Sequence, residues 1–114
     1  MSKSILHTVL PLLLVFSACA IVAFGSDGAA PAVVAEVKID NFTMSPQTIS
    51  VAPGTTVRWT NADDIPHTVV SEDHAFKSRA MDTGDQFAYT FSAPGTFKYF
   101  CSIHPHMTGT IVVK

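Results

Sequence analysis

From residue 33 onward, apolar side chains recur at every second position in several short segments. The clearest of these segments contain Val37 and Ile39, Val57 and Trp59, and Phe87, Tyr89 and Phe91. Successive side chains of a β-strand point to opposite faces, so this period of two is typical of strands with one buried face. Pro-Gly pairs at residues 53–54 and 94–95 separate such segments. About seven strands without a helical period predict an all-β sandwich or barrel.

The N-terminal segment has the composition of a secretory signal peptide. It contains one charged residue, Lys3, followed by an apolar run over residues 9–24. A positive start, an apolar run and small residues after it are typical of export signals, and we expect cleavage after Gly25. The run is shorter than the roughly 20 residues of a membrane span. An uncleaved membrane anchor and lipid attachment at Cys19 are the two alternatives, and both keep the protein exported.

The length of 114 residues suits a single folded domain. We therefore divide the chain into a signal peptide at residues 1–25, a short linker at 26–32 and one domain at 33–114. From Ser26 onward, six basic residues stand against nine acidic ones, and the basic residues form no stripe. This charge pattern argues against a nucleic-acid partner. A domain of this size has a small core, so a bound metal ion would add useful stability.

The expected mature domain keeps a single cysteine, Cys101. Exported domains normally pair their thiols. An unpaired cysteine in such a domain indicates intermolecular pairing, a reactive thiol or a metal ligand. Taken without its neighbours, Cys101 could equally be an inert buried thiol.

The residues around Cys101 favour a metal ligand. Cys101, His104 and Met107 follow one another at intervals of three, directly after a predicted strand, and His67 lies upstream at the start of the expected strand 68–70. A thiolate, two imidazoles and a weak thioether are the ligand set of an electron-transfer copper site. Thiolate and thioether favour Cu(I), whereas imidazole binds both oxidation states. The sequence therefore predicts a copper ion held by His67, Cys101, His104 and Met107.

Each ligand also has an ordinary explanation when it is considered alone. His67 could be a loop histidine, His104 a surface histidine and Met107 a filler of the core. Four residues of these types at this spacing on a β scaffold rarely coincide, and this favours the copper site. His106 lies two positions from His104 and should point to solvent, and we expect His74 to be exposed as well.

Five segments of the domain resemble the cupredoxins, and most closely their amicyanin-like group. These segments are Asn41–Pro46, Val51–Gly54, Val57–Asn61, Pro66–Val69 and Tyr99–His104. The two residues between His104 and Met107 match the short ligand loop of that group. The resemblance implies an eight-stranded Greek-key β-sandwich, one type 1 copper ion and electron transfer between periplasmic redox partners. Many members of the family have asparagine directly after the first histidine, whereas this chain has Thr68, which should face Ser102.

Three function classes compete with an electron carrier. An enzyme would need further histidine clusters, a nucleophile motif or paired carboxylates, and the sequence has none of these. A copper storage or delivery protein would also use Cys, His and Met, and it is the main alternative. A zinc domain is disfavoured because thioether is a poor zinc ligand. We therefore expect a monomeric, periplasmic blue-copper protein that is not an enzyme and that exchanges single electrons with donor and acceptor proteins.

Overall fold

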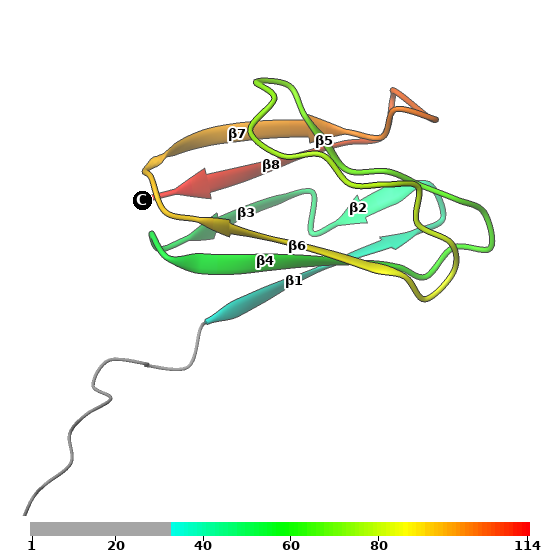
Figure 1. Cartoon of the computed structure of the whole chain (residues 1–114), viewed down its shortest axis with the longest axis horizontal. Helices are drawn as coiled ribbons and strands as arrows, with labels where there is room; N and C mark the ends of the chain where they lie inside the picture. Colours follow the sequence, from blue (N-terminus) through cyan, green and yellow to red (C-terminus); the bar gives the residue numbers. More distant parts are fainter. Residues whose placement is uncertain (1–32) are drawn as a thin grey trace, which may run out of the picture.

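The computed structural model describes residues 33–114, which form eight strands in two facing sheets (Figure 1). The strands are β1 (Val34–Asp40), β2 (Thr43–Ser45), β3 (Thr48–Val51), β4 (Thr55–Asn61), β5 (Val70–Ser71), β6 (Gln86–Phe91), β7 (Gly95–Phe100) and β8 (Thr108–Val113). This part of the chain contains no helix, and the predicted all-β sandwich is confirmed.

The expected signal peptide at residues 1–25 and the linker at 26–32 lie outside the described residues. The two alternatives for that segment, an uncleaved anchor and lipid attachment at Cys19, lie outside them too. Within residues 33–114, no helix has the length and apolar character needed to cross a membrane.

The two sheets have the strand orders β2-β1-β4-β6 and β3-β8-β7-β5. β1 runs parallel to β4 in the first sheet, and β3 runs parallel to β8 in the second. The remaining neighbours are antiparallel. Since each parallel pair joins strands that are not consecutive in the chain, the connections between them pass from one sheet to the other. This crossing places the β4–β5 and β7–β8 loops at the same end of the sandwich (Figure 1).

The segment before β5 differs from the strand expected at residues 68–70, because β5 contains only Val70 and Ser71. The backbone N–H of Thr68 donates to Cys101 Sγ at 3.3 Å, and that of Val69 donates to Ser78 Oγ at 2.8 Å. Side chains thus replace the backbone acceptors that a longer strand would require. The long connection that follows, residues 72–85, has no helical turn, only isolated bridges to residues 67 and 70.

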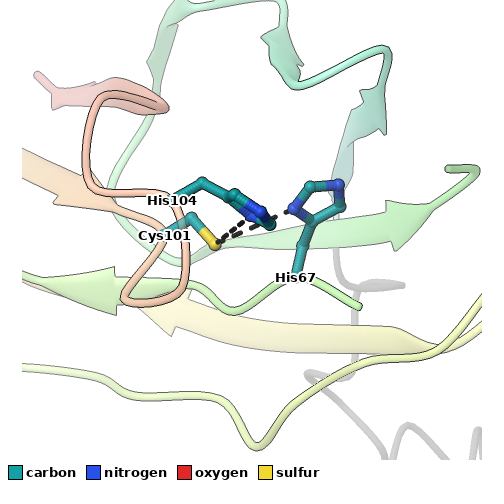
Figure 2. A group of neighbouring side chains, drawn as sticks. All are labelled: His67, Cys101 and His104. Carbon is teal, nitrogen blue, oxygen red and sulfur yellow. Dashed lines mark hydrogen bonds between the residues drawn. The ribbon is translucent and has the colours of Figure 1, made fainter. Parts of the chain in front are cut away.

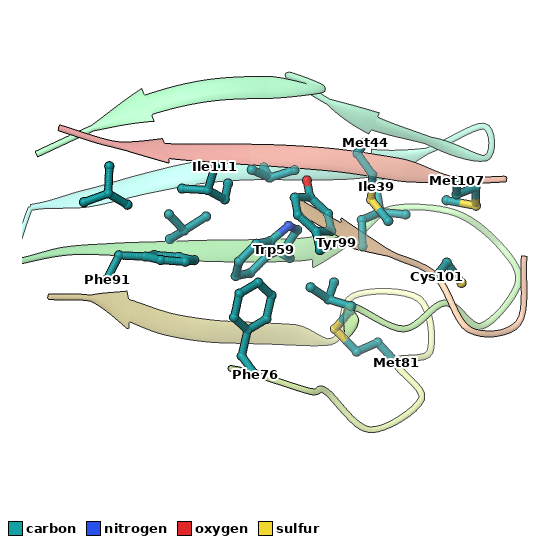
Figure 3. Packing of buried hydrophobic residues seen from close by; sticks show 14 residues of the cluster. Ile39, Met44, Trp59, Phe76, Met81, Phe91, Tyr99, Cys101, Met107 and Ile111 are labelled. Atoms are coloured by element: carbon teal, nitrogen blue, oxygen red, sulfur yellow. The ribbon is translucent and has the colours of Figure 1, made fainter. Parts of the chain in front are cut away.

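The core is centred on Trp59, which is fully buried between the sheets (Figure 3). Its ring centroid lies 5.3–6.4 Å from those of four other aromatic residues, Phe76, Phe87, Phe91 and Tyr99. Aromatic pairs at such distances contribute about 0.5–1.5 kcal/mol each beyond the burial of their area. This rigid centre supports the end of the sandwich where Cys101 and Met107 lie (Figure 3).

Candidate metal centre

Three of the four predicted ligands come together at one end of the sandwich (Figure 2). His67 lies in the β4–β5 connection, Cys101 follows the last residue of β7, and His104 lies in the loop before β8. One donor atom from each residue lies within 4.8 Å of the other two. His67 and Cys101 are fully buried, whereas His104 is partly exposed.

The distances between these donor atoms suit a single metal ion. Cys101 Sγ lies 3.8 Å from His67 Nδ1 and 3.9 Å from His104 Nδ1. Metal bonds of about 2.0 Å to imidazole and about 2.3 Å to thiolate, opened to about 120°, separate nitrogen from sulfur by about 3.7 Å. One ion can therefore contact all three residues without a large rearrangement.

Met107, the fourth predicted ligand, is buried at the same end of the sandwich as Cys101 (Figure 3). Its backbone closes the ligand loop at both ends. The Cys101 N–H donates to the Met107 carbonyl at 3.0 Å, and the Met107 N–H donates to the His104 carbonyl at 2.9 Å. The short loop is thus folded on itself, and the side chain of Met107 is shielded from solvent.

The surroundings of Cys101 lower the pKa of its thiol and so favour the thiolate. Burial by itself raises its pKa, but polar contacts with the Thr68 N–H, the His67 ring and the backbone of His104 outweigh burial and lower the pKa to about 6. Its usual value is 9.0. Since metals bind the thiolate, a lower pKa makes more of the binding form available at neutral pH.

Thr68 and Ser102 connect the two ligand loops, as the sequence suggested. The hydroxyls of the two residues lie 2.7 Å apart, and the Ser102 N–H donates to Thr68 Oγ1, also at 2.7 Å. Thr68 Oγ1 further lies 3.7 Å from Cys101 Sγ. Thr68 therefore bridges the loop of His67 and the loop of Cys101 through its hydroxyl.

Asp63 is a functional residue that the sequence analysis missed. Its Oδ2 accepts a hydrogen bond from His67 Nε2 at 2.8 Å, which leaves Nδ1 of His67 facing Cys101. The backbone N–H of Phe42 and then the His67 ring hold the pKa of the Asp63 carboxyl below its usual range. Carboxylates commonly orient ligand imidazoles in this way. An acid four positions before a predicted ligand is the signal that could have identified it.

Phe42 is a second residue that the sequence analysis missed in this role. Its ring packs edge-on against both imidazoles, with centroids 5.6 Å from His67 and 5.2 Å from His104. By contrast, His106 and His74 are exposed, as expected. Neither belongs to the group of donor atoms found within residues 33–114.

The chain is similar in sequence and in fold to known proteins. The family model of the cupredoxin-like domain matches residues 9–113. Amicyanin-alpha of Methylorubrum extorquens is 34% identical over 109 residues, which cover 87% of this chain and 90% of that protein.

Two solved structures have similar folds. A purple cupredoxin from Nitrosopumilus maritimus superposes with a TM-score of 0.68 at 35% identity, covering 70% of this chain and 99% of that one. A Cu-containing nitrite reductase from Thermus scotoductus gives a TM-score of 0.66 at 29% identity, and the match covers 73% of this chain but only 22% of the enzyme.

Proposed function

The chain belongs to the cupredoxin-like family, and from this premise we propose that it is an exported type 1 copper protein that carries single electrons between other redox proteins. The observation that carries this proposal is the buried thiol of Cys101, whose sulfur lies within 3.9 Å of two imidazole nitrogens. A soft thiolate with two imidazoles is the donor set that copper takes in electron-transfer sites.

We propose that His67 Nδ1, Cys101 Sγ and His104 Nδ1 would hold the copper ion, with the thioether of Met107 as a weaker fourth ligand. When bound, copper would supply one-electron chemistry through its Cu(I) and Cu(II) states. The chain's own contribution is to hold the donor atoms still in both states. Asp63 orients His67, and the Thr68–Ser102 bridge ties its loop to that of Cys101. A site supported in this way needs little reorganisation when its charge changes.

The surface around His104 suits brief contact with a redox partner. His104 is the one ring of the group that reaches solvent, and its neighbour Ile103 is 48% exposed. Pro105, the next residue along the loop, is also exposed and uncharged. Small contacts of this kind are typical of electron-transfer complexes. We propose that separate donor and acceptor proteins bind there in turn and that the protein acts as a monomer.

The main alternative is a copper storage or delivery protein. Such a protein must pass its ion to another ligand set, which requires access to the soft donors. Within residues 33–114, Cys101 is fully buried and Met107 is 5% exposed, whereas His104 is partly exposed. This enclosure favours an ion that stays bound while electrons move.

An enzymatic role has less support. The match to the nitrite reductase covers only 22% of that enzyme. The match to amicyanin-alpha of Methylorubrum extorquens, by contrast, covers 90% of that protein. We therefore propose an electron carrier and not an enzyme.

We also propose that the protein works in the periplasm after cleavage of the chain behind Gly25. Mass analysis of the secreted protein would test this cleavage site, because we expect Ser26 at the N-terminus.

Voltammetry of the copper-loaded protein separates the carrier from the delivery protein. We expect a reversible one-electron wave that persists over repeated cycles, with copper still bound after reduction and gel filtration. Loss of copper to the buffer on each reduction, with decay of the wave, would instead support delivery.

A further inference from the structure

The turn between β1 and β2 has an unusual backbone conformation for its residues. Asn41 has a φ of 49° and Phe42 a φ of 57°, so both are left-handed. Asparagine adopts this region readily, but a bulky aromatic residue does so rarely. Glycine is the usual choice at the second position of such a hairpin turn. A phenylalanine held there therefore calls for a reason.

Burial in the core does not explain Phe42. The residue is 49% exposed and lies outside the buried hydrophobic cluster. Its inner contacts are instead with the two imidazoles of the metal centre, at interplanar angles of 85° for His67 and 90° for His104. The two imidazole centroids are 5.1 Å apart, so one aromatic ring covers both.

His104 has less polar support than His67. Nε2 of His67 is bound to Asp63, but within residues 33–114 no protein group is hydrogen-bonded to Nε2 of His104. Ligand imidazoles usually have such a partner, which fixes the orientation of the ring. On the side that faces the β1–β2 turn, the ring of His104 is therefore restrained by its edge-on contact with Phe42.

Asp63 connects the turn to the centre. Its Oδ2 accepts hydrogen bonds from the Phe42 N–H at 3.0 Å and from His67 Nε2 at 2.8 Å. The same carboxylate oxygen thus fixes one ligand and the backbone that carries the covering ring. The strained turn and the metal centre are held as a single unit.

We propose, building on the copper centre proposed above, that Phe42 is a positioning residue that holds the imidazole of His104 in place and shields the metal from small molecules. Asp63 acts through the backbone of Phe42 and through His67. The role of Phe42 is distinct from a docking role, because it concerns how long the ion stays bound and how the His104 ring is ordered before any partner arrives.

Phe42→Gly separates this role from that of the turn. Glycine adopts a positive φ without strain, so the variant should keep the conformation of the turn and remove only the aromatic ring. Phe42→Leu adds apolar bulk without an aromatic edge. Ile103→Ala is the matched control, since Ile103 is 48% exposed and precedes His104 in the loop.

Two measurements test the proposal. The first is the rate at which bathocuproine disulfonate removes Cu(I) from each loaded protein. We expect Phe42→Gly to raise this rate about tenfold, the factor expected from losing aromatic contacts of this kind. Phe42→Leu should fall between it and wild type, and Ile103→Ala should change the rate by less than about twofold. Removal from Phe42→Gly at the Ile103→Ala rate would overturn the proposal.

The second measurement uses the metal-free protein, so it does not depend on the proposed function. NMR relaxation of the His104 ring should show greater disorder in Phe42→Gly than in wild type or Ile103→Ala, with no loss of thermal stability. A His104 ring equally ordered in all three proteins would overturn the positioning role. Failure of the wild-type protein to bind copper would contradict the proposed function and leave this second result to decide on Phe42.

Discussion

Thr68 shows how much of the centre depends on single hydroxyl groups. Its Oγ1 accepts the Ser102 N–H and lies 2.7 Å from the Ser102 hydroxyl. Thr68→Val keeps the shape but leaves the Ser102 N–H without this acceptor. We expect a loss of about 1–3 kcal/mol in the free energy of unfolding of the metal-free protein, measured by urea denaturation.

Thr56 provides the matched control for that prediction. Its hydroxyl pairs with that of Thr90 at 2.8 Å on the exposed face of a sheet. Because solvent replaces the lost partner there, Thr56→Val should change the free energy of unfolding by less than about 0.5 kcal/mol. Equal losses in the two variants would show that the Thr68 bridge adds nothing specific to the site.

The ligands were predictable from sequence to different degrees and for different reasons. Cys101, His104 and Met107 lie within seven consecutive positions, so their chemistry can be read together. Asp63 and Phe42 could not be assigned in the same way. Their roles depend on how the β4–β5 connection folds and on a left-handed turn, and Asn-Phe lacks the glycine that usually marks such a turn.

At the scale of the strands, Gly109 is required for β7 and β8 to approach each other. It lies opposite Tyr99 in the ladder, and a Cβ at position 109 would overlap the Tyr99 ring. Tyr99 is fully buried, so its ring has no free space to move into. Gly109→Ala should therefore destabilise the protein by about 1–3 kcal/mol or more. Thermal unfolding would measure this loss.

The neighbouring residue supplies the comparison. Thr108 is exposed at the start of β8, and Thr108→Ala should be nearly neutral. A Gly109→Ala protein as stable as Thr108→Ala would contradict the close packing of Tyr99 against the β8 backbone.

Strands and connections also differed in how well the sequence predicted them. The alternating segments of β4 and β6 form half-buried strands, as predicted. Such strands can be predicted because the alternation of apolar and polar residues identifies the buried face. The segment before β5 could not be predicted in that way. Its backbone N–H groups are bound by Cys101 and Ser78, which lie far along the chain or across a loop.

For the whole molecule, the thiol of Cys101 predicts how the stability of the metal-free protein depends on pH. The folded pKa of about 6 lies below the usual 9.0, so the folded state binds fewer protons between these values. The free energy of unfolding should therefore rise from pH 6 to pH 9. The stabilising contribution of the thiol is complete above the pKa of the unfolded state, and it is lost as the pH falls through the pKa of the folded state.

Cys101→Ser isolates this effect from the two nearby imidazoles, which remain in the variant. The difference in free energy of unfolding between wild type and Cys101→Ser should grow with pH over that range, as followed by urea denaturation. A constant difference would mean that the pKa of the thiol is the same in the folded and unfolded protein.

We propose that Cys101 joins His67 and His104 in a single copper centre. Titration of the metal-free protein with Cu(II), followed by visible absorption, tests it most directly. Wild type should develop an intense thiolate-to-copper charge-transfer band, and Met107→Leu should keep it, because the axial thioether is only a weak donor. Cys101→Ser should show no such band at any copper concentration. An intense band that survives in Cys101→Ser would show that the thiolate of Cys101 does not bind the copper ion.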